Sequence, residues 1–369
     1  MPSRRTHAST DLNATAAAAL RDMAALQDTG HGQRGYAKAA TAVLGLEVPL
    51  DRLRRRDGTL TRIPLVGPSS TRILLEVLDQ GSSPTLERLI DERGQHAVID
   101  GLRALRQGFL SRAAALEVLD LAGTDLRAHY RGDLQLHSTW SDGQDTVQAM
   151  ADGCRARGYS FCAMTDHSGG LSIARGLSPE RLRAQADEIA QVNRDFAGAF
   201  HVFAGVEANI TPEGGVDVTA DQLQTLDLVV AAPHSGLRTT KAQTARIIAA
   251  VDTAGVRILG HPRGRKYGVR GGVAADWPRI FAAAAERGVA IELDGDPSRQ
   301  DLDCTLAVQA RRAGCLFALD SDAHAVSQLW YTDLAMAHAL LAGIPLDRIV
   351  NCWPLDRFRI WLEAARSRP

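Results

Sequence analysis

From about residue 130 onward the chain alternates between short apolar runs and helical stretches, and this alternation restricts its fold more than any other feature. Parallel strands joined by helical crossovers produce such a pattern, because two parallel strands need a long connection between them. Seven repeats in about 240 residues predict an α/β fold and suit a barrel of the TIM type. A doubly wound open sheet is the alternative, although no GxGxxG or Walker A pattern supports a nucleotide-binding version of it. The strand-like runs are Asp133–His137, Phe161–Asp166, His201–Val206, Leu226–Ala232, Val256–Gly260, Val289–Leu293 and Leu316–Leu319.

The first third of the chain has a different character. Thr15–Gln27 and Tyr36–Leu46 are rich in small and apolar residues and are predicted helices. A further helix is expected after the turn at Gly67, with Ser69 or Ser70 as its N-cap. We therefore expect an all-α domain over residues 1–125 and a barrel over residues 126–369.

The net charge is −1, so any contact with nucleic acid must come from local patches. The five cysteines form no CxxC pair, which argues against a disulfide framework or a cysteine-type zinc site. No apolar run approaches the roughly 18 residues of a membrane span, and the first residues do not have the pattern of a secretory signal. We expect a cytoplasmic protein with no membrane partner.

Histidines gather at the ends of the strand-like runs. Because parallel barrels build their active sites at the carboxyl ends of the strands, these side chains should converge on one face together with Glu207. More than four such ligands favour a cluster of two or three divalent ions, Zn²⁺, Mn²⁺ or Fe²⁺. Asp133 and Asp320 are candidates to orient the histidines by bonding their second ring nitrogens. The histidines are His137, His167, His234, His261 and His324.

The order of these motifs is that of a known family. The run DLQLHSTWSDG, followed by TDHS, GVE, PHS, GHP and SDAH, resembles the PHP (polymerase and histidinol phosphatase) domain. The sequences of these motifs are similar to those of the PHP domain at the C-terminus of bacterial family X DNA polymerases. The resemblance covers about residues 131–362 and implies a seven-stranded, distorted TIM barrel that hydrolyses phosphoesters.

The resemblance also implies the metal ligands. Gln135 stands where many members have His, a departure that polymerase members often share, and a neutral amide would hold its ion more loosely. Glu207, His167 and Asp322 are the implied catalytic residues, and Glu207 is suited to bridge two ions. With Gln135, the implied ligand set is His137, Asp142, His167, Glu207, His234, His261, Asp322 and His324.

The N-terminal third resembles the helix-hairpin-helix domain of the same polymerases, at Arg34–Ala40 and Ile63–Pro68. Such a motif presents backbone N–H groups to a DNA phosphate, so residues 60–80 are a candidate DNA contact. Leu65 replaces the first glycine of the usual Gly-x-Gly hairpin. Only about 35 residues separate the helix-hairpin-helix region, which ends near Asp91, from the PHP start. They are too few for a polymerase palm and fingers, so we expect no polymerase activity.

Basic residues follow three of the strand ends and are candidate substrate contacts, since cations there would stabilise a phosphate. Three hypotheses follow. The first is a metal-dependent DNA 3′–5′ exonuclease or 3′-end processing enzyme, the second a small-molecule phosphomonoesterase of the histidinol phosphatase type, and the third a non-enzymatic DNA-binding scaffold. The nearly complete ligand set argues against the scaffold. The candidate substrate contacts are Arg238, Lys241, Arg263, Arg265, Lys266, Arg270 and Arg299.

Overall fold

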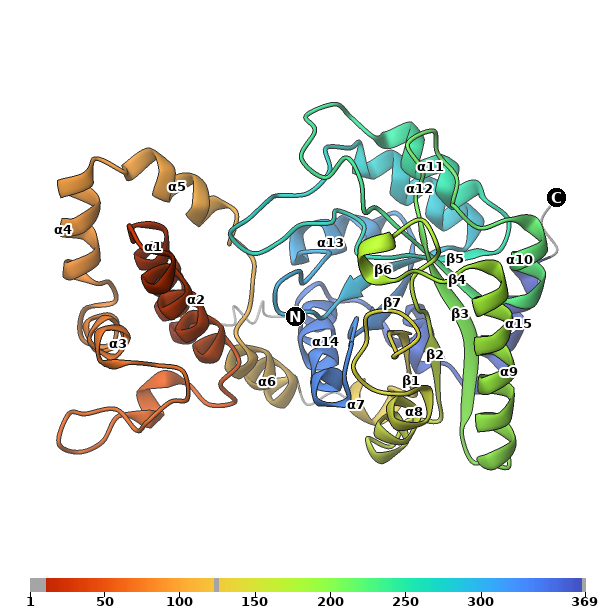
Figure 1. The fold of residues 1–369 in the computed structure, drawn as a ribbon, viewed down its shortest axis with the longest axis horizontal. Helices are drawn as coiled ribbons and strands as arrows, with labels where there is room; N and C mark the ends of the chain where they lie inside the picture. Colours follow the sequence, from red (N-terminus) through yellow and green to blue (C-terminus); the bar gives the residue numbers. More distant parts are fainter. Residues whose placement is uncertain (1–10, 123–125, 367–369) are drawn as a thin grey trace, which may run out of the picture. The chain divides into compact units, whose positions relative to one another are not determined.

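The computed structural model describes residues 11–122 and 126–366, which form two compact units (Figure 1). The described part of the first unit contains residues 11–121 together with 267–269, and the second unit contains the remainder. The boundary drawn from the sequence, between residues 125 and 126, stays a prediction.

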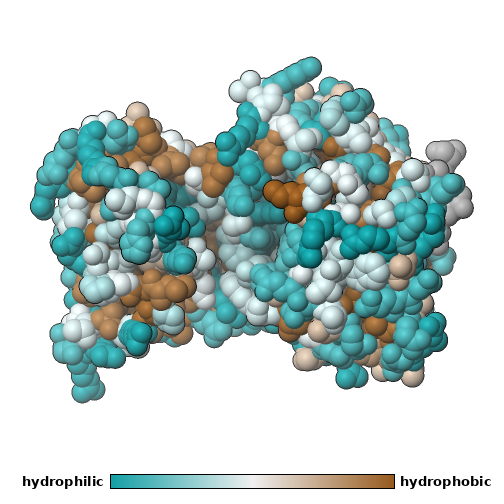
Figure 2. Space-filling model, viewed as in Figure 1, coloured by the Kyte–Doolittle hydropathy of each residue, from teal (hydrophilic) through white to brown (hydrophobic). Residues whose placement is uncertain are grey.

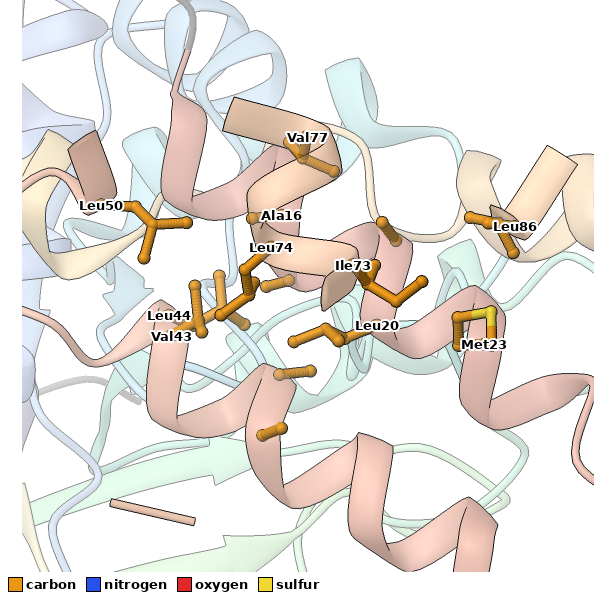
Figure 3. Packing of buried hydrophobic residues seen from close by; sticks show 14 of the residues in the cluster. Ala16, Leu20, Met23, Val43, Leu44, Leu50, Ile73, Leu74, Val77 and Leu86 are labelled. Carbon is orange, nitrogen blue, oxygen red and sulfur yellow. The ribbon is translucent and has the colours of Figure 1, made fainter. Parts of the chain in front are cut away.

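The first unit is helical, as the sequence predicts. Helix α1 packs against both α2 and α3 around Leu20, Val43 and Leu74, all of them fully buried (Figure 3). Asp11 caps α1 by accepting a hydrogen bond from the Ala14 N–H (2.9 Å). The elements are α1 Leu12–Ala25, α2 Gly30–Leu44, η1 Leu50–Leu53, α3 Pro68–Gln80, α4 Pro84–Arg93, α5 His96–Ala104 and α6 Arg112–Leu121.

The start of α3 differs from the prediction of a serine cap. The helix begins at Pro68 with Gly67 as its N-cap, and no side chain caps it. Proline suits the first helical position, because its fixed φ is already helical and its missing N–H would have no intrahelical partner there. Ser69 and Ser70 therefore lie inside the first turn, and the prediction that one of them caps the helix was wrong.

Seven parallel strands form the second unit, in the order β1 to β7 with every strand paired to the next along the chain. Each predicted run overlaps one of them. Strand β7 ends at Asp320, so Asp322 and His324 lie on the loop beyond it rather than on a continued strand. The strands are β1 Gly132–Leu136, β2 Phe161–Met164, β3 His201–Asn209, β4 Leu228–Ala232, β5 Val256–Leu259, β6 Ala290–Asp294 and β7 Leu316–Asp320.

Side chains close the seam where β7 meets β1. Among the described strands no ladder joins these two, and a single bridge pairs Leu136 with Ala323. Asp320 accepts from the Leu134 N–H (2.9 Å). In the reverse direction Asp133 accepts from the Ser321 N–H (3.1 Å). The two carboxylates thus replace missing ladder bonds and complete a nearly closed barrel.

Apolar side chains from all seven strands fill the interior of the barrel. Phe358 and Trp361 of α15 join this core, and Phe358 stacks on Phe161 at the first residue of β2, with ring centroids 4.9 Å apart. Helix α15 therefore covers the end at which the strands begin, and the opposite end is left for the polar residues.

Helices of the second unit lie outside the strands (Figure 1). In the described part of the chain, no helix has the length and apolarity that a membrane span requires. The elements are α7 Leu126–His129, α8 Val147–Ala156, α9 Pro179–Asp195, α10 Ala220–Thr225, α11 Thr244–Asp252, α12 Trp277–Arg287, α13 Cys304–Arg312, α14 Thr332–Leu341 and α15 Leu355–Arg366, with the short 3₁₀ turns η2 Ser172–Ala174, η3 Val326–Tyr331, η4 Leu346–Arg348 and η5 Val350–Cys352.

Candidate metal centre

Glu207 is the centre of the polar cluster at the carboxyl end of the strands. It lies within β3 and is fully buried. Its Oε1 lies 2.7 Å from Nε2 of His261 and 3.1 Å from Nε2 of His234. Its Oε2 lies 3.1 Å from Nδ1 of His167 and 3.4 Å from Nε2 of His137. Four histidines from four strand ends therefore meet one carboxylate, as expected if parallel strands end on a shared face.

A second group surrounds His137, which directly follows β1. Its Nε2 lies 3.0 Å from Asp322 Oδ1, and its ring stacks on His324 with centroids 4.2 Å apart. Asp142 Oδ1 lies 3.4 Å from Nε2 of His324 and 3.6 Å from Nε2 of His167. The structure thus brings together all eight of the His, Asp and Glu side chains in the predicted ligand set.

Seven of these side chains, all except His261, form three overlapping groups, and within each group the potential ligand atoms lie within 4.8 Å of one another. Several of their buried atoms have no hydrogen-bond partner in the described chain, among them both ring nitrogens of His137, Glu207 Oε2 and Asp322 Oδ2. Imidazole and carboxylate groups gathered in this way fit divalent transition ions. The groups are His137, Asp142, His167 and His324; His167, Glu207 and His234; and His137, Glu207 and Asp322.

Burial and neighbouring groups shift the pKa values of the side chains in the cluster. Burial raises the pKa of Glu207, but its electrostatic interactions with His167 and two further histidines outweigh burial and hold that pKa well below its usual value. Burial lowers the pKa of His167 to about 4. For His324, burial is outweighed by the hydrogen bond to Asp142, and its pKa rises to about 9. Burial also opposes ionisation of Asp142, yet His324 and its neighbours lower that pKa to about 2. The protonation state of each group therefore depends on its burial and on the groups beside it.

The histidines are oriented by partners that sequence reasoning missed. Nδ1 of His234 lies 2.7 Å from Asn209 Oδ1, and Nδ1 of His324 lies 2.8 Å from the backbone carbonyl oxygen of Asp322. Asp133 and Asp320, which were expected in this role, bond backbone N–H groups across the seam instead. The expectation was wrong because strand closure, which the local pattern does not show, uses both carboxylates.

Two further buried carboxylates support the site and were also missed. Asp166, in the loop after β2, accepts from the Ser138 N–H (2.8 Å) and the Ser141 N–H (3.1 Å), and so holds the loop that carries Asp142. Glu292 of β6 accepts from the backbone N–H of His261. An apolar strand interrupted by Glu292 and followed by Asp294 is a signal in the sequence that could have revealed this layer.

Gln135 is fully buried within β1, and neither its amide oxygen nor its amide nitrogen has a hydrogen-bond partner in the described chain. A β-carbon added at Gly260 would lie 3.3 Å from the Gln135 Oε1, so the amide lies close to the end of β5. Buried amides without partners are rare. The position is compatible with a weak metal contact by Gln135, which stays a prediction.

The basic candidates have different surroundings. Arg299 lies beside the cluster, with Nη1 3.4 Å from Asp322 Oδ2, and although burial lowers its pKa, Asp322 and other carboxylates raise that pKa above its usual value. Arg265 is buried and donates to the backbone carbonyls of Arg299 (2.9 Å) and Gln300. Arg263 pairs with Asp303 (2.5 Å).

The other basic candidates lie on the loops. Arg270 is half-buried and donates to the Gly264 carbonyl oxygen (2.7 Å). Arg238, Lys241 and Lys266 are exposed. Arg299 is therefore the described candidate for which the structure records an ion pair with a ligand of the cluster.

Comparison with known proteins gives relatives of two kinds. The chain is 37% identical over 200 residues to "DNA polymerase/3′-5′ exonuclease PolX" of Bacillus subtilis, a match that covers 54% of this chain and 35% of that relative. It thus spans only about a third of that protein's length. It is 33% identical over 178 residues to a "Probable phosphatase" of Yersinia pestis, covering 46% of this chain and 69% of the relative. A "Probable phosphatase" of Shewanella frigidimarina is 28% identical over 240 residues, a match that covers 62% of this chain and 89% of that relative.

Among solved structures, histidinol phosphate phosphatase from Lactococcus lactis, complexed with zinc, L-histidinol and phosphate, is similar with a TM-score of 0.45 and 18% identity. That match covers 58% of this chain and 95% of the other. No family model matches the chain. On these matches the chain belongs to the PHP family of phosphoester hydrolases.

Proposed function

We propose that the chain hydrolyses phosphodiester bonds of DNA, as a 3′–5′ exonuclease or a 3′-end processing enzyme, with two or three Zn²⁺, Mn²⁺ or Fe²⁺ ions. The observation that carries the proposal is the convergence of eight potential ligand side chains, Glu207 among them, at the carboxyl end of the strands. The likeness to PolX, whose name includes this exonuclease activity, supports DNA as the substrate.

The side chains of the cluster would hold the ions. One carboxylate oxygen of Glu207 lies beside His261 and His234, and the other lies beside His167 and His137. Bound divalent ions lower the pKa of water and neutralise charge on a phosphoryl group. Glu207, His167 and Asp322 are the proposed catalytic residues, because they belong to more than one ligand group or hold Arg299 in place. Arg299 would then contact a phosphoryl oxygen, since a guanidinium donates in the geometry that phosphate accepts.

A phosphomonoesterase acting on a small molecule is the second candidate. Its support is the likeness to probable phosphatases, one of which the chain matches over 89% of that protein's length. The ligand cluster suits either substrate. A DNA-binding scaffold without activity is the weakest candidate, since a scaffold has no need for eight converging ligands. The cytoplasmic location inferred from the sequence stays a prediction.

One assay separates the three candidates. Single-stranded DNA labelled at its 5′ end and a chromogenic phosphomonoester are each incubated with Mn²⁺ and either the wild type or His324→Ala. Stepwise shortening of the DNA that is lost in the variant supports the exonuclease. Monoester turnover with intact DNA contradicts it and supports the small-molecule enzyme. Activity on neither substrate, with no metal retained by elemental analysis, supports the scaffold.

A further inference from the structure

Asp217 is not one of the predicted ligands, yet its carboxylate accepts several hydrogen bonds beside the metal centre. Its Oδ1 accepts from the Ser168 hydroxyl (2.6 Å) and from the backbone N–H of Asn209 (2.8 Å). Its Oδ2 accepts from the Gly170 N–H (3.1 Å) and from the side-chain amide of Asn209 (2.6 Å). Ser168 directly follows His167, and Asn209 is the last residue of β3. One carboxylate thus joins the loop after β2 to the end of β3.

A tight hairpin in the chain places Asp217 beside Asn209. The intervening residues 210–216 fold back on themselves, with an antiparallel bridge between their two ends. Gly214 and Gly215 form the bend with φ of 97° and 79°, a conformation that glycine adopts without strain. The Asp217 N–H donates to the Asn209 carbonyl oxygen (3.1 Å) and completes the hairpin. The pairing of the two side chains therefore follows from local sequence.

Hydrogen bonding determines which way the side-chain amide of Asn209 points. A carboxylate accepts hydrogen bonds and donates none, so the NH₂ group of Asn209 must face Asp217. The same NH₂ group donates to the hydroxyl oxygen of Ser168 (2.9 Å), whose own proton goes to Asp217. Both hydrogens of the amide nitrogen are therefore used, and the amide oxygen points to the opposite side.

The amide oxygen of Asn209 lies 2.7 Å from Nδ1 of His234. Because this oxygen can only accept, a neutral His234 carries its proton on Nδ1 and keeps a lone pair on Nε2. Nε2 lies 3.1 Å from Glu207 Oε1 and has no hydrogen-bond partner in the described chain. A lone pair and a carboxylate oxygen repel each other unless a cation lies between them. This tautomer is therefore the one that suits a metal ligand.

The surroundings of the network explain why more than one bond is needed. Ser168 is buried, whereas Asn209 and Asp217 are half-buried. Hydrophilic side chains predominate on the surface of the second unit that Figure 2 shows. Half-buried groups can exchange a protein partner for water, so a single bond would hold the amide of Asn209 weakly. Asp217 and Ser168 together hold it in one orientation.

We propose that Asp217 is a positioning residue that sets the tautomer of His234 through the amide of Asn209, and so prepares Nε2 to bind a metal ion. The inference rests on the proposed role of His234 as a ligand and deepens it, because it names a group that acts one residue further out than Asn209. Groups that orient a ligand typically change metal affinity by about 10- to 100-fold when they are removed.

The first measurement is the tautomer itself, read from imidazole nitrogen chemical shifts. The full chain is labelled with nitrogen-15 at histidine, freed of metal with EDTA, and kept at about pH 8.5, where an imidazole of ordinary pKa is neutral. The signals that are absent from His234→Gln assign this residue. We expect Nδ1 to carry the proton in the wild type. Protonation mainly at Nε2 would overturn the inference, and this result needs no variant at Asp217.

The second measurement compares variants of Asp217. Asp217→Asn replaces one acceptor oxygen by an NH₂ group, so the amide of Asn209 is free to turn over. We expect a mixture of His234 tautomers and a Zn²⁺ affinity that is about 10- to 100-fold lower, by competition with a chromophoric chelator. The matched control is Asp221→Asn, which removes the same charge from an exposed position of α10 and should behave as the wild type does. Wild-type tautomer and affinity in Asp217→Asn would overturn the inference.

An exchange of the two side chains separates positioning from a merely structural role. Asn209→Asp/Asp217→Asn keeps the net charge and presents a carboxylate to Nδ1 of His234, which accepts in either orientation. We expect this variant to regain the Nδ1-protonated tautomer and most of the Zn²⁺ affinity. The amide at position 217 does not restore the full set of acceptors for the loop at Gly170, so a structural role predicts no such recovery. Failure to recover both would overturn the inference.

These results also separate the inference from the proposed function. A His234 tautomer that depends on Asp217, in a chain that binds neither Zn²⁺ nor Mn²⁺, would refute the proposed metal centre and leave the control of the tautomer standing. Metal binding and phosphoester hydrolysis with a tautomer independent of Asp217 would refute the positioning role alone.

Discussion

At the scale of the residue, the role of a buried polar side chain depends on the groups that surround it. Glu207 and His338 are both buried, yet they have opposite surroundings. Glu207 is surrounded by ligating groups, whereas His338 of α14 has a neutral amide as neighbour, with its Nε2 2.8 Å from the Oε1 of Gln300. The first belongs to the candidate metal centre and the second to the packing of a helix.

Glu207→Gln should reduce metal content and phosphoester hydrolysis by more than about a hundredfold. The neutral amide of glutamine is a poor metal ligand, and Glu207 belongs to two of the three ligand groups, so both would be weakened at once. Elemental analysis after dialysis and turnover of the preferred substrate measure the two effects. The matched control is Glu286→Gln, which changes an exposed glutamate of α12. Wild-type metal content in Glu207→Gln would show that Glu207 is not a ligand.

His338 should make the barrel less stable as the pH falls. Burial lowers the pKa of its imidazole to about 3 in the folded protein, against about 6.5 in the unfolded chain. Because the unfolded state binds the proton first, stability is complete above pH 6.5 and is lost as the pH falls towards 3. Between pH 7 and pH 5 the loss should be about 2 kcal/mol.

His338→Gln removes this proton uptake and keeps a polar group beside Gln300. Urea unfolding at pH 7 and at pH 5, for both proteins, isolates the contribution of the imidazole as the difference between the two pH effects. The same loss of stability in wild type and variant would mean that His338 is protonated without cost in the fold.

At the scale of the element, the seam between β7 and β1 decides whether the sheet becomes a barrel. Asn351 of η5 spans it, donating to the carbonyl oxygens of Gly132 (2.9 Å) and Leu319 (3.0 Å) and to Asp320 Oδ1 (2.8 Å), while it accepts from the Leu319 N–H (2.7 Å). One buried amide therefore joins the first strand to the last. Closure matters for the site, because His137 and Asp322 stand on opposite sides of this seam.

Asn351→Ala should lower the free energy of unfolding by about 3 kcal/mol, since several buried backbone groups lose their partner. Asn351→Asp keeps the acceptor for the Leu319 N–H but places a second carboxylate next to Asp320, so it should be at least as destabilising as the alanine variant near neutral pH. Urea unfolding curves measure both. A loss below about 1 kcal/mol in both variants would mean that the seam is held by other contacts.

At the scale of the whole molecule, the two units have separate apolar cores, one within the helices and one within the barrel. The ligand set belongs wholly to the second unit. Metal that binds the folded barrel and not the unfolded chain stabilises only that unit, by about 2.7 kcal/mol at a free concentration a hundredfold above Kd.

Calorimetry of the full chain should therefore show two transitions, of which one moves to higher temperature with Zn²⁺ or Mn²⁺ and returns in EDTA. Asp322→Asn should abolish the shift of that transition and leave the other in place. A single transition, or a metal shift that persists in Asp322→Asn, would contradict the assignment of metal to this group of ligands.

By itself the sequence determined the order of the elements, the seven parallel strands and the convergence of the histidines. Each follows from local information, since the alternation of strand and helix implies parallel strands, and parallel strands end on one face. The residues at those ends, from His137 to His324, could therefore be predicted before any contact was known.

Only the tertiary structure decided which partner each polar group takes. Asp133 and Asp320 close the seam rather than orient histidines, and Asn209 supports His234. Arg265, in the loop after β5, donates to backbone carbonyls in the loop after β6. These pairings join segments far apart in the chain, and they depend on strand register and barrel closure. A pattern with a period of two residues indicates which face a side chain occupies but not which atom from another strand lies opposite it.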